Sequence, residues 1–388
     1  MDPMSHVVTA FTAQDHAFMG RALQLAARGL YSTDPNPRVG CVLVRDGQVV
    51  GEGFHARAGE AHAEVLALRA AGDAARGATA YVTLEPCSHH GRTPPCADAL
   101  AAAGVDRVVA AMVDPNPRVA GRGLARLRAA GVQVESGLLE AEARELNPGF
   151  IRRMERGRPW VRVKLAASLD GRTAMADGES RWITGEAARA DVQRLRARSS
   201  AVLTAMGTVA ADDPRLNLRL TPADLGIDAP VRQPARVVLD RTGRLSPGAQ
   251  LFTAPGGPVW VFTAQEALER QRAALEAAGA RVDAVPLRDG HLDLTAVLQA
   301  LAAREVNEVH LEAGPTLAGA LLQAGLMDEC VLYLAPHLMG TQARGLFHLP
   351  IHDMAGRLPL EIREVRPVGR DWRLTLQVAA PGDGAGPG

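Results

Sequence analysis

A histidine, a glutamate and two cysteines that suit a metal-centred reaction lie between residues 62 and 96. They occur as His62-Ala63-Glu64, then Pro86-Cys87, and then Cys96 after eight intervening residues. One imidazole and two thiolates are ligands that zinc prefers, and three protein ligands leave a fourth position for water. That open position is typical of catalytic zinc, whereas a structural site usually has four protein ligands. Glu64 remains outside the ligand set, close enough to move protons at that water.

Two helix starts are expected to position these residues. A helix from about Ala61 puts His62 and Glu64 in its first turn, and Pro94-Pro95 places Cys96 at the start of another helix. Side chains two apart do not face each other on a helix flank, but both can reach an atom that lies off the helix N-terminus. The two helix dipoles would then stabilise thiolate at the metal.

The His-x-Glu and Pro-Cys parts match the zinc nucleobase deaminases, in which zinc-bound hydroxide attacks an amino-bearing ring carbon and the glutamate shuttles the proton. That pattern has two residues between the cysteines, whereas this chain has eight, residues 88–95. We interpret the longer segment as a substrate loop. Its His89 and His90 are expected to line a pocket or face water rather than bind metal. Cys41 and Cys330 are expected to be packed thiols.

Composition limits the class of protein. The chain has 388 residues, of which 47% are hydrophobic and 22% charged, so about two globular domains are expected. Basic and acidic residues balance at 43 each, which argues against a nucleic-acid-binding protein. Four cysteines are too few for a disulfide framework. The chain start lacks a secretion signal and no long apolar run occurs, so we expect a cytoplasmic protein without membrane contact.

Lysine usage is unusual. Lys164 is the only lysine, and the other 42 basic residues are arginine. A lysine kept in such a composition can mark a place where a compact ammonium is needed, although chance or a core-edge ion pair explains it equally well.

Helix and strand patterns alternate along both halves of the chain, which predicts sheets with helices on their faces. The expected domains are residues 1–157 and 158–380, with a disordered tail at 381–388. In the first domain, strands at 39–44 and 49–50 flank an Asp46-Gly47 turn, further strands lie at 80–84, 107–112 and 132–134, and helices lie near 18–26, from 61, after 95, from 123 and within 139–158. In the second, strands are expected near 160–167, 201–205, 235–239, 258–263, 306–311 and 329–335, helices near 186–197, 265–278, 293–303 and 315–325, and a closing hairpin at 360–366 and 371–379.

Nearly the whole chain resembles a known family. Asn36-Pro37-Arg38-Val39-Gly40-Cys41, His62-Ala63-Glu64 and the run from Leu84 to Cys96 are similar to the bifunctional riboflavin-biosynthesis deaminase–reductases of bacteria, including the eight-residue cysteine spacing. The resemblance covers about residues 13–379. It implies an α/β protein with a cytidine-deaminase-like, three-layer α/β/α N-terminal domain and a dihydrofolate-reductase-like α/β C-terminal domain.

The resemblance also implies two successive reactions. Zinc-dependent deamination of 2,5-diamino-6-ribosylamino-4(3H)-pyrimidinone 5′-phosphate would come first. Reduction of the ribosyl side chain with NADPH would follow, giving 5-amino-6-(5-phosphoribitylamino)uracil. His62, Cys87 and Cys96 match the zinc ligands and Glu64 the proton shuttle. The expected partners are this pyrimidine ribotide and further copies of the chain, as a dimer or a tetramer.

Four segments carry the reductase resemblance, namely Lys164–Arg172, Ser180–Thr184, Gly207–Leu216 and Glu312–Leu317. The last follows a strand and opens a helix, so its free backbone N–H groups suit a cofactor phosphate. The resemblance implies cofactor contacts from Ala166, Trp182, Thr208, Asp212, Gly314, Pro315, Thr316 and Leu317. For the substrate it implies contacts from Asn36, Ser180, Arg196, Arg215, Leu216, Arg219 and Glu312. The three arginines are expected to hold the substrate phosphate, and Asn36, His55 and Gly59 are candidates for reading the pyrimidine.

Two points stay open at the sequence level. Lys164, Asp170 or a water supplies the proton that accompanies the hydride. Asp240 is followed by Arg241, where the family often has serine near the cofactor. Arg241 therefore either contacts the 2′-phosphate of NADPH or points to water.

Two rival functions predict different properties. A free-nucleobase or tRNA deaminase with an inactive second domain predicts no NADPH binding, and the neutral charge and the cysteine spacing count against it. A zinc-stabilised interaction module predicts a fourth protein ligand on zinc.

Overall fold

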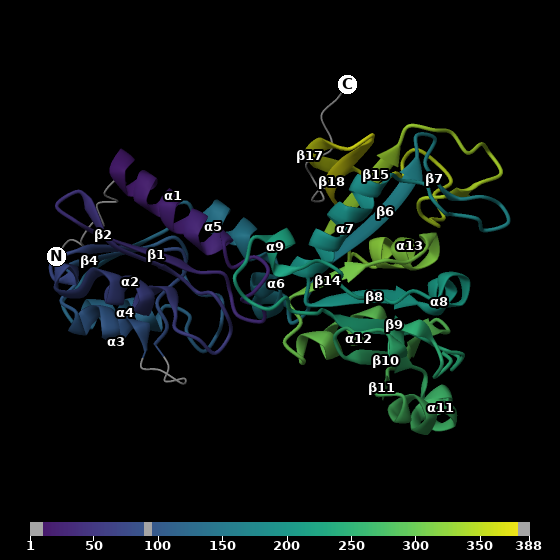
Figure 1. The fold of residues 1–388 in the computed structure, drawn as a ribbon, viewed down its shortest axis with the longest axis horizontal. Coiled ribbons are helices and arrows are strands. Elements are labelled where there is room, and N and C mark those ends of the chain that lie inside the picture. Colours follow the sequence, from purple (N-terminus) through teal and green to yellow (C-terminus); the bar gives the residue numbers. More distant parts are fainter. Residues whose placement is uncertain (1–10, 89–94, 379–388) are drawn as a thin grey trace. The chain divides into compact units, whose positions relative to one another are not determined.

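The computed structural model describes residues 11–88 and 95–378. The chain divides into two compact units between Glu155 and Arg156, and each unit is described separately (Figure 1). The domain limits at residues 157 and 158 that the sequence suggests stay a prediction. The tail at 381–388 and both histidines of the predicted substrate loop, His89 and His90, lie outside the described residues.

The smaller unit contains one five-stranded sheet in the order β2-β1-β3-β4-β5. β1 is antiparallel to β2 and β3, whereas β3, β4 and β5 are parallel. The strands are β1 Gly40–Arg45, β2 Gln48–Phe54, β3 Thr79–Val82, β4 Arg107–Ala110 and β5 Gln133–Ser136. The helices are α1 Ala13–Ala27, α2 Ala63–Ala71, the 3-10 helix η1 Gly72–Ala75, α3 Cys96–Ala102, α4 Arg122–Ala129, α5 Glu140–Leu146 and α6 Pro148–Arg156.

Two hydrophobic cores make this unit a three-layer α/β/α structure, as the sequence predicts. Met19 of α1 and Phe150 of α6 pack with Val42 on one face of the sheet. Ala67 of α2 and Leu100 of α3 pack on the other face. The β1–β2 turn has Asp46 and Gly47 at φ 51° and 74°, the left-handed conformation that an Asp-Gly hairpin turn requires.

The larger unit is built on a nine-stranded sheet in the order β11-β10-β9-β8-β14-β6-β15-β18-β17. Its strands are β6 Trp160–Ser168, β8 Ala201–Ala205, β9 Ala235–Leu239, β10 Val259–Thr263, β11 Ala280–Ala284, β14 Glu308–Leu311, β15 Glu329–Ala335, β17 Leu360–Val368 and β18 Asp371–Val378. Two short pairs lie outside it, β7 Arg172–Ala174 with β16 Arg344–Gly345 and β12 Leu287–Arg288 with β13 His291–Leu292. The helices are α7 Glu186–Arg198, α8 Met206–Asp212, α9 Pro222–Leu225, α10 Gln250–Thr253, α11 Gln265–Ala277, α12 Leu294–Ala302 and α13 Pro315–Gln323.

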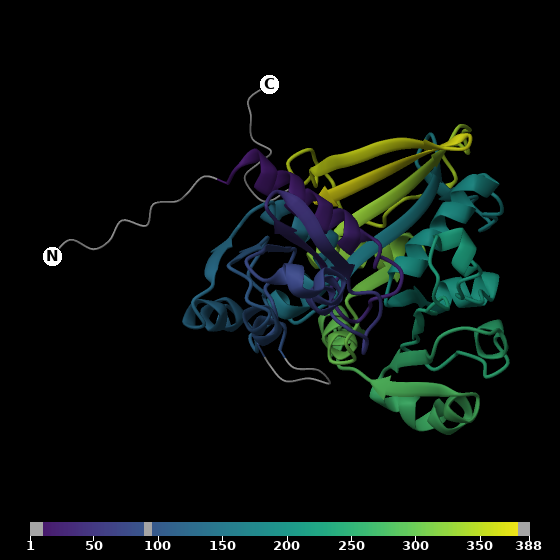
Figure 2. The same ribbon diagram turned by 60° about the vertical axis from the view of Figure 1, so that its left-hand side comes forward.

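Helices cover both faces of this sheet. Leu298 of α12 and Leu321 of α13 pack on one face. Leu195 of α7 packs on the other face beside Tyr333, and Leu275 of α11 packs against Val261. In sheet order, the strands from β11 to β15 are parallel. The β17–β18 hairpin, yellow in Figure 2, pairs antiparallel with β15 at one edge. In a parallel sheet of this kind, ligands bind at the carboxyl ends of the strands.

Every long helix and strand expected from the sequence forms within a few residues of its predicted limits. Sequence reasoning missed β7, β11, β12, β13 and β16 and the helices α8, α9 and α10. These elements are short, and tertiary contacts rather than a hydrophobic period define them. Among the described residues, no helix is long and apolar enough to cross a membrane.

Candidate functional site

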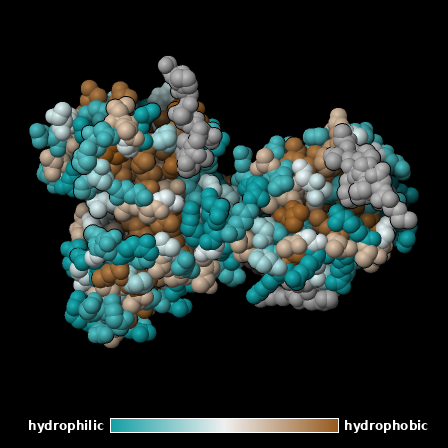
Figure 3. Space-filling model, turned by 180° about the vertical axis from the view of Figure 1, so that it is seen from behind, coloured by the Kyte–Doolittle hydropathy of each residue, from teal (hydrophilic) through white to brown (hydrophobic). Residues whose placement is uncertain are grey.

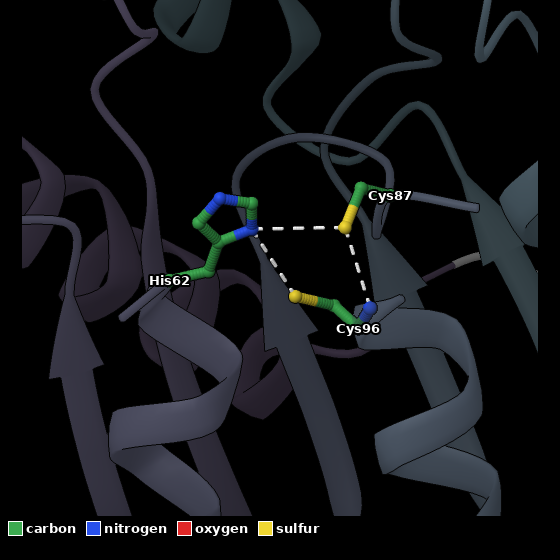
Figure 4. A group of neighbouring side chains, drawn as sticks. All are labelled: His62, Cys87 and Cys96. Atoms are coloured by element: carbon green, nitrogen blue, oxygen red, sulfur yellow. Dashed lines mark hydrogen bonds between the residues drawn. The ribbon is translucent and has the colours of Figure 1, made fainter. Parts of the chain in front are cut away.

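Three side chains in the smaller unit converge on one point, as Figure 4 shows. Nδ1 of His62 lies 3.6 Å from Sγ of Cys87 and 3.3 Å from Sγ of Cys96. All three ligand atoms lie within 4.8 Å of one another. Ligands at about 2.0–2.3 Å from a tetrahedral zinc ion are about 3.5 Å apart, so the group fits zinc.

Local structure explains why these residues meet. His62 is the N-cap of α2, and Cys96 is the first residue of α3, as the proline pair before it predicts. Cys87 follows β3 on a loop, and its sulfur accepts a hydrogen bond of 3.3 Å from the backbone N–H of Cys96. Cys41 and Cys330 are buried and free, and each packs in a hydrophobic core, so the prediction of packed thiols is confirmed.

Glu64 lies in the first turn of α2 with its side chain buried. Burial raises the pKa of Glu64 to about 7. A carboxyl group with a pKa near neutrality can both take up and release a proton. Hydrogen bonds from Cys96 and His62 lower the pKa of the Cys87 thiol to about 4, which favours the thiolate that binds metal.

Asn36 is connected to this group of residues by a contact with His55. Nδ2 of Asn36 is 3.0 Å from Nε2 of His55, and Nδ1 of His55 is 3.1 Å from the carbonyl oxygen of Ala61. The His55 and His62 rings meet edge to face, with centroids 5.2 Å apart. Burial lowers the pKa of His55, which favours the neutral ring. Its Nδ1–H then donates to Ala61, and its Nε2 accepts from the Asn36 amide.

One residue that organises this site was missed by sequence reasoning. The buried Glu85 carboxylate accepts hydrogen bonds from the backbone N–H groups of Asp114, Gly121, Gly123 and Leu124, at distances of 3.0, 2.8, 2.7 and 3.3 Å. Glu85 thereby fixes the segment that carries Cys87 to the loop after β4. No local pattern could have indicated this role, because the donors lie 29 to 39 residues away along the chain.

The larger unit contains a cavity of about 2050 Å³ at the carboxyl ends of its central strands. That volume exceeds the roughly 300–1,000 Å³ of a site for one small molecule, so it can hold two ligands. Almost all of the reductase residues expected from the sequence line this cavity: Lys164, Ala166, Ser180, Trp182, Arg196, Thr208, Asp212, Arg215, Leu216, Arg219, Glu312, Gly314, Pro315, Thr316 and Leu317.

Arg196 lines the cavity and is paired with a carboxylate there. Its Nε and Nη2 donate to the two carboxylate oxygens of Glu312 at 2.5 and 2.8 Å, and its Nη1 donates to the carbonyl of Asn217 at 2.7 Å. These bonds use three of the five N–H groups of the guanidinium, and the expected contact of Arg196 with the substrate phosphate stays a prediction. Arg219, in contrast, is exposed on the cavity wall.

Lys164 lines the cavity from β6. Burial lowers the pKa of Lys164, and the negative charge of Glu312 partly opposes that shift. His310 Nε2 lies 3.3 Å from Oε1 of Glu312. Lys164 interacts electrostatically with Glu312 and Arg196, so the three side chains form one charged group on the cavity wall.

Asp170 is not among the residues that line the cavity. Its carboxylate accepts a hydrogen bond from the Ser168 hydroxyl at 2.5 Å and two from the backbone N–H groups of Met339 and Gly340, at 3.1 and 2.8 Å. These donors lower the pKa of Asp170 to about 2, with the Ser168 bond as the main cause. Asp170 thus fixes the end of β6 to the loop after β15, and its predicted catalytic role stays a prediction.

Some cavity residues were not predicted from the sequence, and for Arg241 the sequence left two roles open. Arg241, Arg244 and His291 line the wall beyond β9, and Arg189 stacks on Trp182 with its guanidinium 4.4 Å from the ring centroid. Arg244 and His291 belong to no motif that could be recognised from their spacing.

Comparison with known proteins agrees with this geometry. Residues 159–374 match the family model described as the RibD C-terminal domain, and residues 12–112 match the cytidine and deoxycytidylate deaminase zinc-binding region. The riboflavin biosynthesis protein RibD of Escherichia coli is 53% identical over 94% of this chain and 99% of its own length. The chain belongs to the RibD family.

Solved structures support the same assignment. Form 1 of Acinetobacter baumannii RibD has a TM-score of 0.86 at 48% identity, and the match covers 95% of this chain and 99% of that one. A Thermotoga maritima diaminohydroxyphosphoribosylaminopyrimidine deaminase/5-amino-6-(5-phosphoribosylamino)uracil reductase has a TM-score of 0.79 at 33% identity, covering 94% and 99%. The protein is thus a bifunctional deaminase and reductase of riboflavin biosynthesis that uses zinc and NADPH. The rival interpretations as an isolated nucleobase deaminase or an interaction module are not supported.

Proposed function

We propose that this chain converts 2,5-diamino-6-ribosylamino-4(3H)-pyrimidinone 5′-phosphate in two steps, with deamination in residues 1–157 and reduction in residues 158–380. The observation that carries the first step is the convergence of His62, Cys87 and Cys96 beside the buried Glu64. The three ligands hold zinc, which supplies the Lewis acidity that makes water a nucleophile at neutral pH.

Glu64 moves the protons of the deamination. The reaction replaces the ring 2-amino group with an oxygen from water, so one proton must leave the water and one must reach the departing ammonia. A buried carboxyl group with a pKa of about 7 is suited to both transfers. Asn36, held by His55, is a donor and acceptor for the edge of the pyrimidine.

The cavity of the larger unit holds the cofactor and the deaminated product together. The turn from Gly314 to Leu317 offers the free N–H groups of the start of α13 to the cofactor phosphates. Ala166, Trp182, Thr208 and Asp212 contribute the rest of the cofactor contacts, and Ser180 and Leu216 contact the substrate.

Lys164 is the proposed proton donor for the reduction. NADPH would supply the hydride for C1 of the ribosyl group, and a proton must reach the ring oxygen as its bond to C1 breaks. Lys164 faces the cavity and has a lowered pKa, whereas Asp170 lies outside it. Glu312 and Arg196 orient the substrate as a pair. Arg219 and Arg215, both exposed on the wall, bind the phosphate of the substrate.

We propose that the chain forms a homo-oligomer through the β17–β18 hairpin. Leu360, Ile362, Val365 and Trp372 are exposed there, and Trp372 is 50% exposed. Cross-strand pairing places these four side chains on the same sheet face as the buried Leu376. They lie outside the part of that face that helices cover. Figure 3 shows hydrophobic side chains gathered on the surface of the larger unit, at the left of that view. Such a surface on an open sheet edge is suited to a second copy.

We also propose a cytoplasmic location, where Cys87 and Cys96 stay reduced.

The experiment that tests the proposal follows both reactions in one cuvette. Purified protein, zinc, the diaminopyrimidine ribotide and NADPH are mixed, and ammonia release and NADPH loss are recorded together. One ammonia per NADPH oxidised is expected. Ammonia without NADPH oxidation would contradict the reductase assignment, and neither signal from folded, zinc-loaded protein would contradict the substrate.

A further inference from the structure

The loop at residues 34–39 carries Asn36, the proposed contact to the pyrimidine, but it forms neither helix nor strand. At its start, the backbone N–H of Asn36 donates to the carbonyl of Thr33 at 2.9 Å. At its end, the carbonyl of Val39 accepts from the N–H of His55 at 2.9 Å. The middle of the loop is held by a side chain from much later in the chain.

That side chain is Asn147, which lies 109 residues after its partner Arg38. Its Oδ1 accepts a hydrogen bond from the backbone N–H of Arg38 at 2.8 Å, and its Nδ2 donates to the backbone carbonyl of Arg38 at 2.9 Å. One amide thus pairs with both polar backbone groups of one residue, as a neighbouring strand would. Both residues are buried, so water cannot readily replace these bonds.

Asn147 is itself anchored in the hydrophobic core. It lies between α5 and α6, where its N–H donates to the carbonyl of Arg144 and its carbonyl accepts from the N–H of Ile151, both at 3.1 Å. Ile151 and Phe150 of α6 are buried in the core that also contains Met19 of α1. The Asn147 amide therefore ties the loop to a helix that is fixed by packing.

The link between Asn36 and the clamped residue Arg38 is short and stiff. Only Pro37 separates the two. Proline fixes its own φ and restricts the residue before it. Consecutive Cα atoms are about 3.8 Å apart, so the Cα of Asn36 lies within about 8 Å of the Cα of Arg38. A shift of the Arg38 backbone must therefore move Asn36.

Asn36 also contacts the surroundings of the metal group. Its Nδ2 lies 3.0 Å from Nε2 of His55, whose ring packs edge to face against the ring of His62. This contact uses one N–H of the Asn36 amide and leaves the second N–H and the Oδ1 for the pyrimidine. His55 thus fixes the end of the Asn36 side chain, whereas the position of its backbone depends on Asn147.

We propose that Asn147 is a positioning residue of the deamination, which holds Asn36 in place beside His55. It touches no reacting atom and acts through the backbone of Arg38. The proposal rests on the deamination proposed above and on the role of Asn36 in it. Asparagine suits the position because it offers one donor and one acceptor side by side, whereas alanine offers neither.

The experiment is a double-mutant cycle on ammonia release. The kcat and KM for the diaminopyrimidine ribotide are measured in the wild type, Asn147→Ala, Asn36→Ala and the double variant. Asn147→Ala should lower kcat/KM about tenfold or more, because a displacement of about 1 Å can cost about 10²-fold. Most of the loss should appear as a higher KM, since Asn36 binds the ring and moves no proton. In the Asn36→Ala background, the same substitution should change kcat/KM less than about twofold.

Tyr81→Phe is the matched control. The Tyr81 hydroxyl donates to Oδ1 of the buried Asp15 at 2.7 Å, in the same unit but in a contact with α1 rather than with the loop. This variant should lower the melting temperature of the unit, as Asn147→Ala does, and leave kcat/KM unchanged. Zinc content and NADPH oxidation with pre-deaminated substrate should stay at wild-type levels in all variants. If Asn147→Ala does not fold, Asn147→Ser takes its place in the cycle.

Four results would overturn the proposal. Losses that multiply in the double variant would mean that Asn147 supports the unit as a whole. An unchanged kcat/KM in Asn147→Ala would mean that the loop holds its own position, and one in Asn36→Ala would remove the residue through which Asn147 acts. Loss of zinc from Asn147→Ala would assign the role of Asn147 to the metal ligands. Wild-type protein that releases no ammonia would instead contradict the deamination itself.

Discussion

Arg196 and Glu312 form a two-point ion pair at the cavity wall, from α7 to the end of β14, and their side chains are 9% and 16% exposed. Two expected substrate residues thus bind each other. The pair presents a rigid, nearly neutral surface to the cavity, and Arg219 next to it carries the free positive charge.

Substitutions of Arg196 and of Arg219 should separate the structural role of the ion pair from the binding of substrate phosphate. Arg196→Ala leaves the buried Glu312 carboxylate without its partner, and we expect a loss of about 3–5 kcal/mol in the free energy of unfolding of the larger unit. Arg219→Ala should change that free energy by less than about 0.5 kcal/mol while raising the KM for the reductase substrate. Chemical unfolding and steady-state NADPH oxidation measure the two effects. A stable Arg196→Ala protein with a raised KM would show that the arginine acts on substrate phosphate after all.

Glu64→Gln should retain zinc and lose ammonia release. The amide keeps the shape of the side chain, but it cannot take a proton from water and return it to the amine. We expect a decrease of at least about 10²-fold in the deamination rate, with zinc content unchanged by elemental analysis. NADPH oxidation with pre-deaminated substrate should stay at the wild-type rate. Near-normal ammonia release from this variant would refute the shuttle assignment.

Lys164 can be observed directly because the chain has no other lysine. In protein made with ¹⁵Nζ-labelled lysine, one side-chain signal should titrate with a midpoint below 10.5, since burial disfavours the ammonium. Glu312→Gln should lower that midpoint further, because the carboxylate raises it. If charged Lys164 donates the proton, kcat/KM of the reductase should fall as pH rises through the same midpoint. A kcat/KM that does not change as pH passes through this midpoint would assign the proton donation to water instead of Lys164.

The ionised carboxylate of Asp191 should stabilise the folded larger unit only above acidic pH. Burial opposes its ionisation, but a 2.7 Å hydrogen bond from Tyr333 and the charges of Arg373 and Arg366 outweigh burial and lower its pKa. A lowered carboxyl pKa adds stability above its unfolded value of 3.8, and this stability is lost as pH falls through the folded value.

Asp191→Asn tests that dependence. The variant should be less stable than the wild type by about 2 kcal/mol or more between pH 5 and 7. The difference should shrink below about pH 4, where the wild-type carboxylate also becomes protonated. Urea unfolding at each pH, followed by the signal of the larger unit, provides the measurement. A difference that does not vary with pH would mean that shape, rather than charge, is the contribution of Asp191.

The sequence predicted the metal group well because its residues are close together in the chain and sit at recognisable helix starts. His62, Glu64 and Cys96 needed only local rules. It predicted the reductase cavity through matching segments, but not how the side chains there pair. From the sequence alone, Arg196 is interpreted as a ligand-binding arginine. Its partner Glu312 is 116 residues away along the chain, so no local pattern indicates the ion pair. Glu85, Arg244 and His291 act through contacts with distant segments, so no local pattern indicates them.

Within the described residues, each of the two units is built on hydrophobic cores of its own. Heating should therefore melt the protein in two stages, and a single melting temperature is not defined for it. Each stage should respond to its own ligand, because binding to a folded unit raises only that unit's melting temperature. Removal of zinc should shift the stage of the smaller unit, and addition of NADPH the stage of the larger one. One calorimetric trace thus reports on both active sites without any turnover.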